Sequence, residues 1–294
     1  MSLENTIMFS TSPGVVIDRK NTRINMSTTF NRKCLPSSDE KNIETIWDNR
    51  KKKNSTLFNG TKFRLDTVCQ LFNKETLTFT LNLGLTDYKD FIGTNWSPNA
   101  KQILQHGENE YGNTQACMSD AMGVGSLVLT ADNRAIFLKR SQFCGEANGL
   151  YDIPGGHAEP SELVGKLPMQ EIDLSALNEE AVIDEIYNST LREIRDEVNV
   201  PLDSLTEPIL MGIARNITSS YRPSVEFFVR CSLSGEQVEK LYHKGGAEEY
   251  ESTTIVFIAL DRIKSLQNDD FWNTMAPSAK GCVKLFQLSE ISAE

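Results

Sequence analysis

The segment from Ile183 to Val198 constrains the fold most, because it carries two kinds of side chain on opposite faces of a helix. Apolar residues recur along it at helical spacing: Ile183, Ile186, Tyr187, Leu191, Ile194 and Val198. Such a stripe predicts an amphipathic helix that packs on a core. Three acids, Glu193, Asp196 and Glu197, project together from the other face. Acidic helix faces usually only keep a surface solvated, but a packed helix would hold these acids rigidly, where a cation would offset their repulsion.

Both boundaries of this region carry backbone signals. Asn199 tolerates the left-handed conformation that ends many helices, and Pro201 cannot continue the helix. Upstream, residues 154–159 read Pro-Gly-Gly-His-Ala-Glu. Gly155 and Gly156 have no side chains, so the backbone carbonyls there could come close to a ligand. We therefore expect a glycine loop and an acidic helix to form one site.

Together these segments resemble the two halves of the Nudix box, the signature of the Nudix hydrolases. The second half of that box is Arg-Glu-apolar-x-Glu-Glu-x-Gly-apolar, and here it spans residues 192–200. Asp196 replaces the first Glu of the pair, and Asn199 replaces the glycine. The earlier acid of the box, which pairs with Arg192 in the family, is either Glu162 or Asp184. The stretch before Arg192 is longer than in the family, and we place an insertion at about 163–183.

The lengthened box is similar to that of the animal UDP-glucose pyrophosphatase branch of the family. The likeness extends over most of the chain, through residues 62–65, 83–96, 123–125, 210–216, 245–253 and 277–281. It implies a hydrolase of phosphorus anhydrides that splits UDP-glucose, or related UDP-sugars, into UMP and glucose 1-phosphate. Two alternatives stay open. One is a Nudix pyrophosphatase for ADP-ribose, dinucleotides or coenzyme A, and the other is a non-catalytic binding protein with the Nudix fold.

The resemblance also implies a metal cofactor, Mg²⁺, for which Mn²⁺ could substitute. Magnesium prefers oxygen ligands and is commonly held by a few carboxylates together with substrate phosphates. Glu193 and Glu197 are the expected ligands, joined by Asp196 and the carbonyl of Gly155. Arg192 completes the expected catalytic set. A later acid, Glu251 or Glu226, could add a ligand or a base.

Substrate contacts outside the box are expected on both sides of the glycine loop. Arg140 and Lys280 could bind phosphates, with Gly156 beside them, although either cation could equally be a surface ion pair. Four further residues are candidates for the nucleoside, because aromatic rings stack on bases and Asn or Asp can read base edges or ribose hydroxyls: Phe63, Tyr88, Asn95 and Asp152. Phe63 could instead be a core residue of a strand.

The pattern of elements predicts an α/β fold, a Nudix-type α/β/α sandwich with a mixed sheet and a smaller N-terminal α+β domain. We place the boundary near residue 118, with residues 1–118 as a possible nucleoside wall and 119–294 as the Nudix domain. In the first part we expect a helix at 42–50, strands at 63–71 and 76–83, and helices at about 86–93 and 97–107. In the second part we expect further helices at 234–243 and 269–275, besides strands at 124–130, 134–140, 150–153, 209–214, 224–231, 253–260 and 282–288.

Composition limits the partners. The formal charge of −10 argues against nucleic acid as the main partner, because phosphate contacts need clustered Lys and Arg. The six cysteines show no disulfide or zinc spacing, and no leader or membrane-spanning run is apparent. We expect an intracellular protein of the cytoplasm that acts on a small nucleotide-sugar, without a membrane partner. Its oligomeric state stays open.

Overall fold

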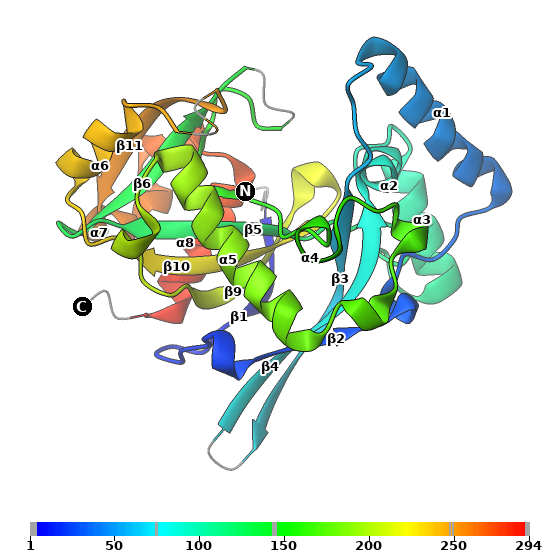
Figure 1. The fold of residues 1–294 in the computed structure, drawn as a ribbon, viewed down its shortest axis with the longest axis horizontal. Coiled ribbons are helices and arrows are strands. Elements are labelled where there is room, and N and C mark those ends of the chain that lie inside the picture. The colour runs from blue at the N-terminus through cyan, green and yellow to red at the C-terminus, as the bar shows by residue number, and fades with distance from the viewer. Residues whose placement is uncertain (1–4, 74–75, 143–145, 247, 249, 292–294) are drawn as a thin grey trace.

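The computed structural model describes residues 5–73, 76–142, 146–246, 248 and 250–291. Within these residues the chain forms two β-sheets that lie beside each other (Figure 1). Helix α5 (Glu179–Val198) runs across the front of both sheets. The expected boundary near residue 118 falls between the strands of the two sheets, except that β1 (Asn5–Ser10) pairs with a strand of the larger sheet.

The larger sheet is mixed, as expected. Its strands follow the order β1-β9-β10-β5-β6-β11, while the short strands β7 and β8 pair with β6 and β5. Among the described pairs of this sheet, β10 and β5 run parallel and the others run antiparallel. Six predicted strands are confirmed with changes in their ends: β5 (Gly123–Leu129), β6 (Arg134–Arg140), β7 (Tyr151–Asp152), β9 (Ile209–Asn216), β10 (Arg222–Arg230) and β11 (Ser252–Ala259). The short strand β8 (Gly155–Gly156) lies in the expected glycine loop and was not predicted as a strand.

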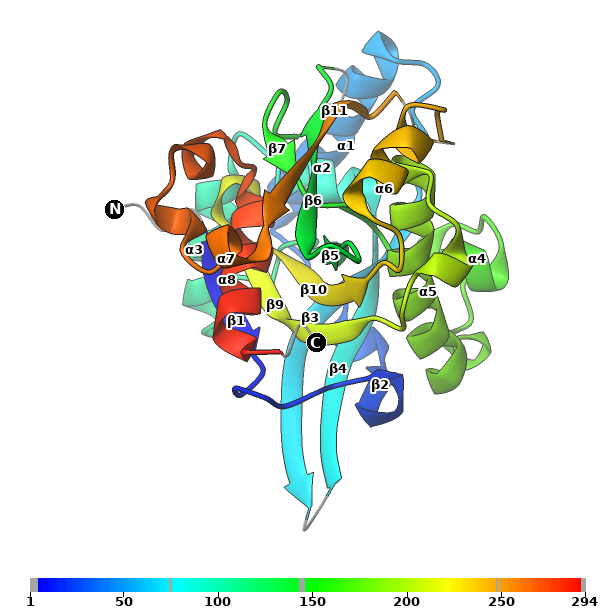
Figure 2. The ribbon, with the colours of Figure 1, turned by 90° about the vertical axis from the view of Figure 1, so that its left-hand side faces the viewer.

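Helices cover both faces of this sheet, which confirms the α/β/α sandwich. Val225 and Phe227 of β10 belong to the buried cluster on the α5 side, whereas Phe228 packs with helix α8 (Pro277–Ser289) on the other. Figure 2 shows α5 and α8 on opposite sides of the strands. Shorter helices lie around them: α4 (Ser161–Val164), α6 (Gly235–Tyr242) and α7 (Leu260–Ile263).

Two sequence-based assignments near the C-terminus need correction. The expected strand at 282–288 is wrong, because these residues lie inside α8. A short apolar run fits a buried strand or a buried helix equally well, and Pro277 begins a helix here. The expected helix at 269–275 is a 3₁₀ helix, Asp270–Thr274.

The smaller sheet has the order β2-β4-β3. Its strands are β2 (Thr22–Met26), β3 (Thr61–Asn73) and β4 (Thr76–Asp87), and its helices are α1 (Ser37–Lys53), α2 (Tyr88–Gly93) and α3 (Ala100–Tyr111). The strand expected at 76–83 is confirmed as part of β4, where every second residue, Phe79, Leu81 and Leu83, is fully buried. Helix α2 is capped by Asp87, whose carboxylate accepts a hydrogen bond from the Asp90 amide.

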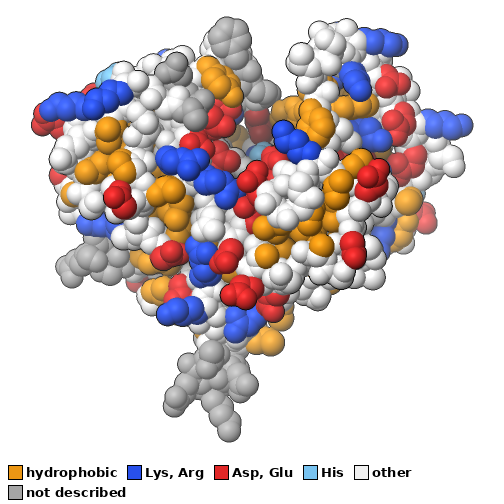
Figure 3. Space-filling model, viewed as in Figure 1, with side chains coloured by type: hydrophobic (Ala, Val, Ile, Leu, Met, Phe, Trp, Pro, Cys, Tyr) orange, Lys and Arg blue, Asp and Glu red, His pale blue; other side chains and the backbone are white. Residues whose placement is uncertain are grey.

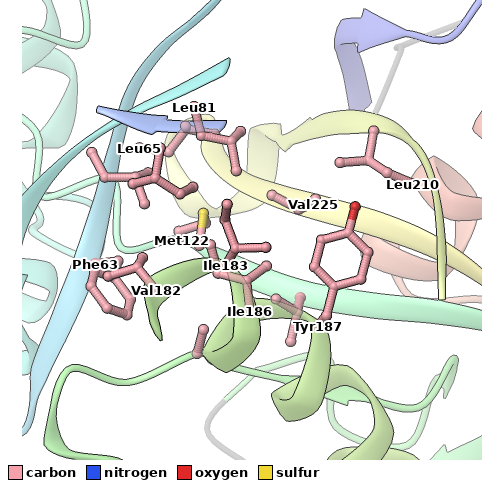
Figure 4. Close-up of a cluster of buried hydrophobic side chains, with 14 of the residues drawn as sticks. Phe63, Leu65, Leu81, Met122, Val182, Ile183, Ile186, Tyr187, Leu210 and Val225 are labelled. Carbon is pink, nitrogen blue, oxygen red and sulfur yellow. The ribbon is translucent and has the colours of Figure 1, made fainter. Parts of the chain in front are cut away.

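The first turns of α5 join the two sheets. Figure 4 shows Val182, Ile183 and Ile186 pointing into a cluster that contains Phe63 and Leu81 of the small sheet. A core shared in this way fixes the position of the small sheet relative to the acidic end of the same helix.

The insertion before α5 is ordered against the small sheet rather than projecting from it. It contains two 3₁₀ turns, Met169–Glu171 and Leu174–Ala176, whose side chains pack on the same apolar cluster. The Thr61 hydroxyl donates to the Leu167 carbonyl at 2.9 Å. Asn178 then caps α5 by accepting from the Ala181 amide. The insertion therefore extends the helix and ties its start to the N-terminal unit.

No helix among the described residues is long and apolar enough to cross a membrane. Five of the cysteines are described, and all five are free: Cys34, Cys69, Cys117, Cys231 and Cys282. Cys144 lies outside the described residues. The cytoplasmic location stays a prediction.

Candidate active site

The C-terminal half of α5 and the glycine loop are joined by two backbone hydrogen bonds. The Gly155 amide donates to Glu197 Oε2 at 3.0 Å, and the His157 amide donates to Glu193 Oε1 at 3.3 Å. Each carboxylate thus has one oxygen fixed by the loop. The two halves of the box are therefore in direct contact through amides of the loop.

Two acids from a distant loop complete the group. Glu248 and Glu251 precede β11, and each offers an oxygen that lies within 4.8 Å of the others and of Glu197. Figure 3 shows acidic side chains gathered where this face is hollowed between the two units. Glu251, one of the two later acids proposed from the sequence, therefore lies with the helix acids. Glu248 was missed, because nothing in its local sequence shows that it folds back onto α5.

Crowding and burial disfavour negative charge on these acids. Burial, followed by the charge of Glu248, raises the pKa of Glu193 to about 7. Burial and then Glu193 raise the pKa of Glu197 well above its ordinary range, and burial and Glu251 raise that of Glu248. A set of carboxylate oxygens this close fits a hard divalent cation, which would favour their charged forms. The donor set contains oxygen only, as magnesium prefers.

Asp196 takes less part in the group of converging carboxylates than its place in the box suggests. Both of its oxygens accept hydrogen bonds from the neighbouring Arg195, at 2.7 and 2.8 Å. It is not one of the three acids whose oxygens converge. In this structure it lies at the side of the group and contributes to it through its charge.

The acid that pairs with Arg192 is Glu185, so both candidates from the sequence are wrong. Arg192 Nη2 donates to the two oxygens of Glu185 at 2.7 and 2.9 Å. Asp184 instead pairs with Arg19 at 2.6 Å, and Glu162 is exposed on α4. The Glu159 amide also donates to Glu185, at 3.1 Å, so this acid ties the loop to the helix.

The close approach of loop and helix depends on Gly156. A Cβ atom added at this position would overlap the carboxylate of Glu193. At Gly155 it would lie 2.5 Å from the Val124 carbonyl of the adjacent strand β5. The double glycine is therefore required by packing at both positions, rather than by an unusual backbone angle.

A cleft with a volume of about 340 Å³ begins at these acids and extends along strands β5 and β10. It is lined by Arg140, as expected, and by Arg222, which the sequence analysis missed. Arg222 Nη1 lies 3.1 Å from His157 Nε2. Burial and the charges of Lys62 and Arg222 lower the pKa of His157 well below its ordinary value. A neutral histidine and two guanidinium groups thus face the acids across the cleft.

A second compartment of about 520 Å³ continues from the first, and Arg140, His157, Arg222 and Glu251 border both. Its far wall comes from the N-terminal unit and is aromatic: Phe58, Tyr88, Phe91 and Trp96. The expected contribution of Tyr88 to this wall fits the structure. Lys166 of the insertion also borders it, with its ammonium group 6.0 Å from the centre of the Phe58 ring.

Three other expected substrate contacts do not line either compartment. Phe63 is fully buried in the core between the sheets, the alternative raised from the sequence. Asn95 is also buried, and its amide nitrogen donates to Asp120 and to the Ser219 carbonyl. Lys280 is buried along α8, with its ammonium group 5.8 Å from the centre of the Trp272 ring. Strand β3 directs Phe63 and helix α8 directs Lys280 into the protein, whereas Asn95 lies in the turn after α2.

Asp152 and Glu226 both border the inner end of the first compartment. Asp152 Oδ1 accepts from the Ser278 hydroxyl at 2.7 Å, and its other oxygen faces Arg140 at 3.4 Å. Glu226 is fully buried on β10, and it is not among the acids that converge with Glu197. Of the two later acids, Glu251 rather than Glu226 is placed to share a cation.

No family model matches the chain, but individual proteins do. The chain is 42% identical to uridine diphosphate glucose pyrophosphatase NUDT22 of Homo sapiens, over 93% of this chain and 89% of the relative. It is 32% identical to Nudix hydrolase 9 of Arabidopsis thaliana, over 79% of this chain and 76% of that protein. Among solved structures, Tm1382, a putative Nudix hydrolase, matches with a TM-score of 0.36 and 16% identity, covering 68% of this chain and 94% of that one.

Proposed function

The chain belongs to the Nudix hydrolase family, and we propose that it hydrolyses UDP-glucose and related UDP-sugars to UMP and glucose 1-phosphate. The observation that carries this proposal is the adjacency of the two compartments. Converging carboxylates occupy one, and an aromatic wall from the N-terminal unit closes the other. This arrangement suits a substrate with a diphosphate at its centre and a stacking group at one end. The names of its relatives in mouse, human and cattle support UDP-glucose as that substrate.

We assign the metal-binding role to Glu193 and Glu197, with Glu248 and Glu251 as the additional acids and Mg²⁺ or Mn²⁺ as the cation. When bound, the cation would acidify a water and neutralise charge on the diphosphate. The Gly155 and His157 amides hold the helix acids in place. Glu185 and Arg192 act as positioning residues that keep the loop on the helix.

Substrate phosphates would meet the guanidinium groups of Arg140 and Arg222, which carry fixed positive charge into the cleft. His157 stays neutral beside them, so it can accept or donate a hydrogen bond without adding charge. The uracil ring would have Tyr88 and Phe58 available for stacking. Asp152, at the inner end, offers oxygens to a base edge or a hydroxyl.

Substrate profiling tests this function most simply. The purified protein would be assayed with Mg²⁺ and with Mn²⁺ against UDP-glucose, other UDP-sugars, ADP-ribose, a dinucleotide and coenzyme A. We expect the highest kcat/KM for UDP-glucose or another UDP-sugar. A clear preference for ADP-ribose, a dinucleotide or coenzyme A would redirect the assignment within the family. Hydrolysis in ¹⁸O-water, followed by mass measurement of UMP and the sugar phosphate, would then identify the phosphorus that water attacks.

A further inference from the structure

Glu226 has an arrangement that the metal site does not explain. The residue is fully buried in the middle of β10, yet it borders the inner end of the first compartment. Among the described residues, no donor reaches either oxygen of its carboxyl group with good hydrogen-bond geometry, although the Ser224 hydroxyl and the Cys282 thiol lie close enough to offset part of the rise that burial causes in its pKa. A buried carboxyl without a partner is costly to the folded state, so it points to a group that arrives from outside.

The neighbouring strand leaves room for this carboxyl group. Gly125 of β5 is the register partner of Glu226. A Cβ atom at Gly125 would lie 2.5 Å from Glu226 Oε2 and 2.8 Å from Ile153 Cδ1. The carboxyl group of Glu226 therefore occupies space that a side chain at position 125 would take.

The surroundings of Glu226 indicate which ligand chemistry fits. Asp152 also borders the inner end of the first compartment, which we call the inner recess. Its oxygens already face Ser278 and Arg140. Burial raises the pKa of Glu226 to about 7, and the charge of Asp152 acts in the same direction. A phosphate placed here would meet two acids. Glu226 is not one of the acids that converge with Glu197, so it is not placed to share a metal ion with them. A neutral N–H or O–H group would instead give the carboxyl the hydrogen bond it lacks.

We propose that this inner recess is a recognition subsite for a neutral hydrogen-bond donor of the substrate, and that Glu226 accepts the bond from it. The proposal builds on the nucleotide-sugar hydrolysis assigned above. Three parts of a UDP-sugar carry such a donor: the imide N–H of uracil, the ribose hydroxyls and the hydroxyls of the terminal sugar. Glu226 is then a specificity residue rather than a metal ligand or a base.

Glu226→Met tests the role directly, because methionine has a similar length and no acceptor oxygen. We expect KM for UDP-glucose to rise about tenfold or more, as for a lost hydrogen bond to a charged group, while kcat changes less than about threefold. The melting temperature should rise, because an unpaired buried carboxyl is replaced by an apolar group. Glu226→Gln keeps one acceptor oxygen, so its KM should lie between those of the wild type and Glu226→Met. Glu239→Gln, an exposed acid on α6, serves as the control.

Calorimetric binding of UDP, which lacks the glucosyl group and needs no turnover, separates the nucleoside from the glucosyl group as the source of the donor. If uracil or ribose provides the donor, Glu226→Met weakens UDP binding by the factor found for KM. If a glucosyl hydroxyl is the donor, UDP binds unchanged while KM for UDP-glucose still rises. An unchanged KM together with unchanged UDP binding would overturn the proposal.

Two further outcomes would also overturn it. A collapse of kcat together with weaker Mg²⁺ binding would make Glu226 part of the metal site, and a lower melting temperature without a selective KM effect would make it structural. The wild-type profile is measured first. If the wild type prefers another nucleotide diphosphate, the same variants are compared on that substrate. This comparison distinguishes a wrong substrate assignment from a wrong role for Glu226.

Discussion

Arg192 donates two hydrogen bonds to Glu185, at 2.7 and 2.9 Å, across two turns of helix α5. Helical residues are separated by about 100°, so positions seven apart lie nearly one above the other, whereas positions eight apart diverge by about 80°. This geometry selects Glu185 over its neighbour Asp184. Since Glu185 also accepts from the Glu159 amide, one carboxylate fixes both the arginine and the end of the glycine loop.

Glu185→Gln should therefore loosen the site without removing a metal ligand. We expect a loss of about 1.5–3 kcal/mol in the free energy of unfolding, the usual contribution of hydrogen bonds to charged groups. Since the loop carries the amides that hold Glu193 and Glu197, we also expect kcat/KM to fall. Denaturant unfolding and steady-state kinetics measure the two effects.

Asp184→Asn and Glu162→Gln are the matched controls, because each replaces an acid of the same region by its amide. Asp184 pairs with Arg19 at a part-exposed position, where an ion pair contributes little. Both controls should keep wild-type stability and activity. If Asp184→Asn or Glu162→Gln were the damaging variant and Glu185→Gln harmless, the assignment of Glu185 would be wrong.

The acid cluster predicts how stability depends on pH when metal is removed. The pKa of Glu193 is raised from its ordinary value of 4.5 to about 7, so its contribution to stability is full below 4.5 and is lost as pH rises through 7. Glu197 and Glu248 shift in the same direction. In EDTA, the melting temperature should fall from about pH 5 to about pH 8.

Adding Mg²⁺ at the higher pH should restore much of that loss, because a bound cation stabilises the charged acids. Glu193→Gln should flatten the pH profile recorded in EDTA. Thermal melts of both proteins, with and without Mg²⁺, provide the measurement. A metal-free protein that gains stability over this pH range would show that the acids are not crowded as the structure has them.

The aromatic wall predicts a binding defect separate from any folding defect. Tyr88→Ala should raise KM for UDP-glucose by about tenfold, since stacking of a base on an aromatic ring contributes about 1–3 kcal/mol. Phe63→Leu is the contrasting variant, because Phe63 lies in the core and not in the wall. It should lower the melting temperature and leave KM close to that of the wild type. Equal KM values for Tyr88→Ala and the wild type would contradict a contribution of the N-terminal unit to nucleoside binding.

Local sequence was sufficient for the parts of the fold that repeat with a clear period. The alternation in β4 and the apolar stripe of α5 both predicted their elements, and the glycine pair next to a helix predicted where loop and acids meet. The prediction of a strand at 282–288 was wrong, because Cys282, Val283, Leu285 and Phe286 are all buried. Burial on most sides removes the polar positions that distinguish a helix from a strand.

The rest of the site depends on tertiary folding that the sequence does not display. Glu248 and Phe58 come from loops far in the chain from Glu197, and only the packed structure brings them to the cleft. The predicted nucleoside contact of Asn95 was wrong because this side chain is used inside the protein. Its amide looked available for a ligand, but buried amides usually bond within the protein, and this one joins Asp120 and Ser219.

The central claim is that Glu248, together with Glu197 and Glu251, belongs to a metal centre for diphosphate hydrolysis. The most direct measurement is Mg²⁺-dependent turnover of UDP-glucose by Glu248→Gln, with Glu239→Gln as the exposed-acid control. We expect Glu248→Gln to need more Mg²⁺ for half-maximal rate and to lose about a hundredfold in kcat, the range seen when one charge-stabilising group is removed. Its metal-free melting temperature should rise, because one repelling charge is gone. Wild-type Mg²⁺ dependence and kcat in Glu248→Gln would contradict the account.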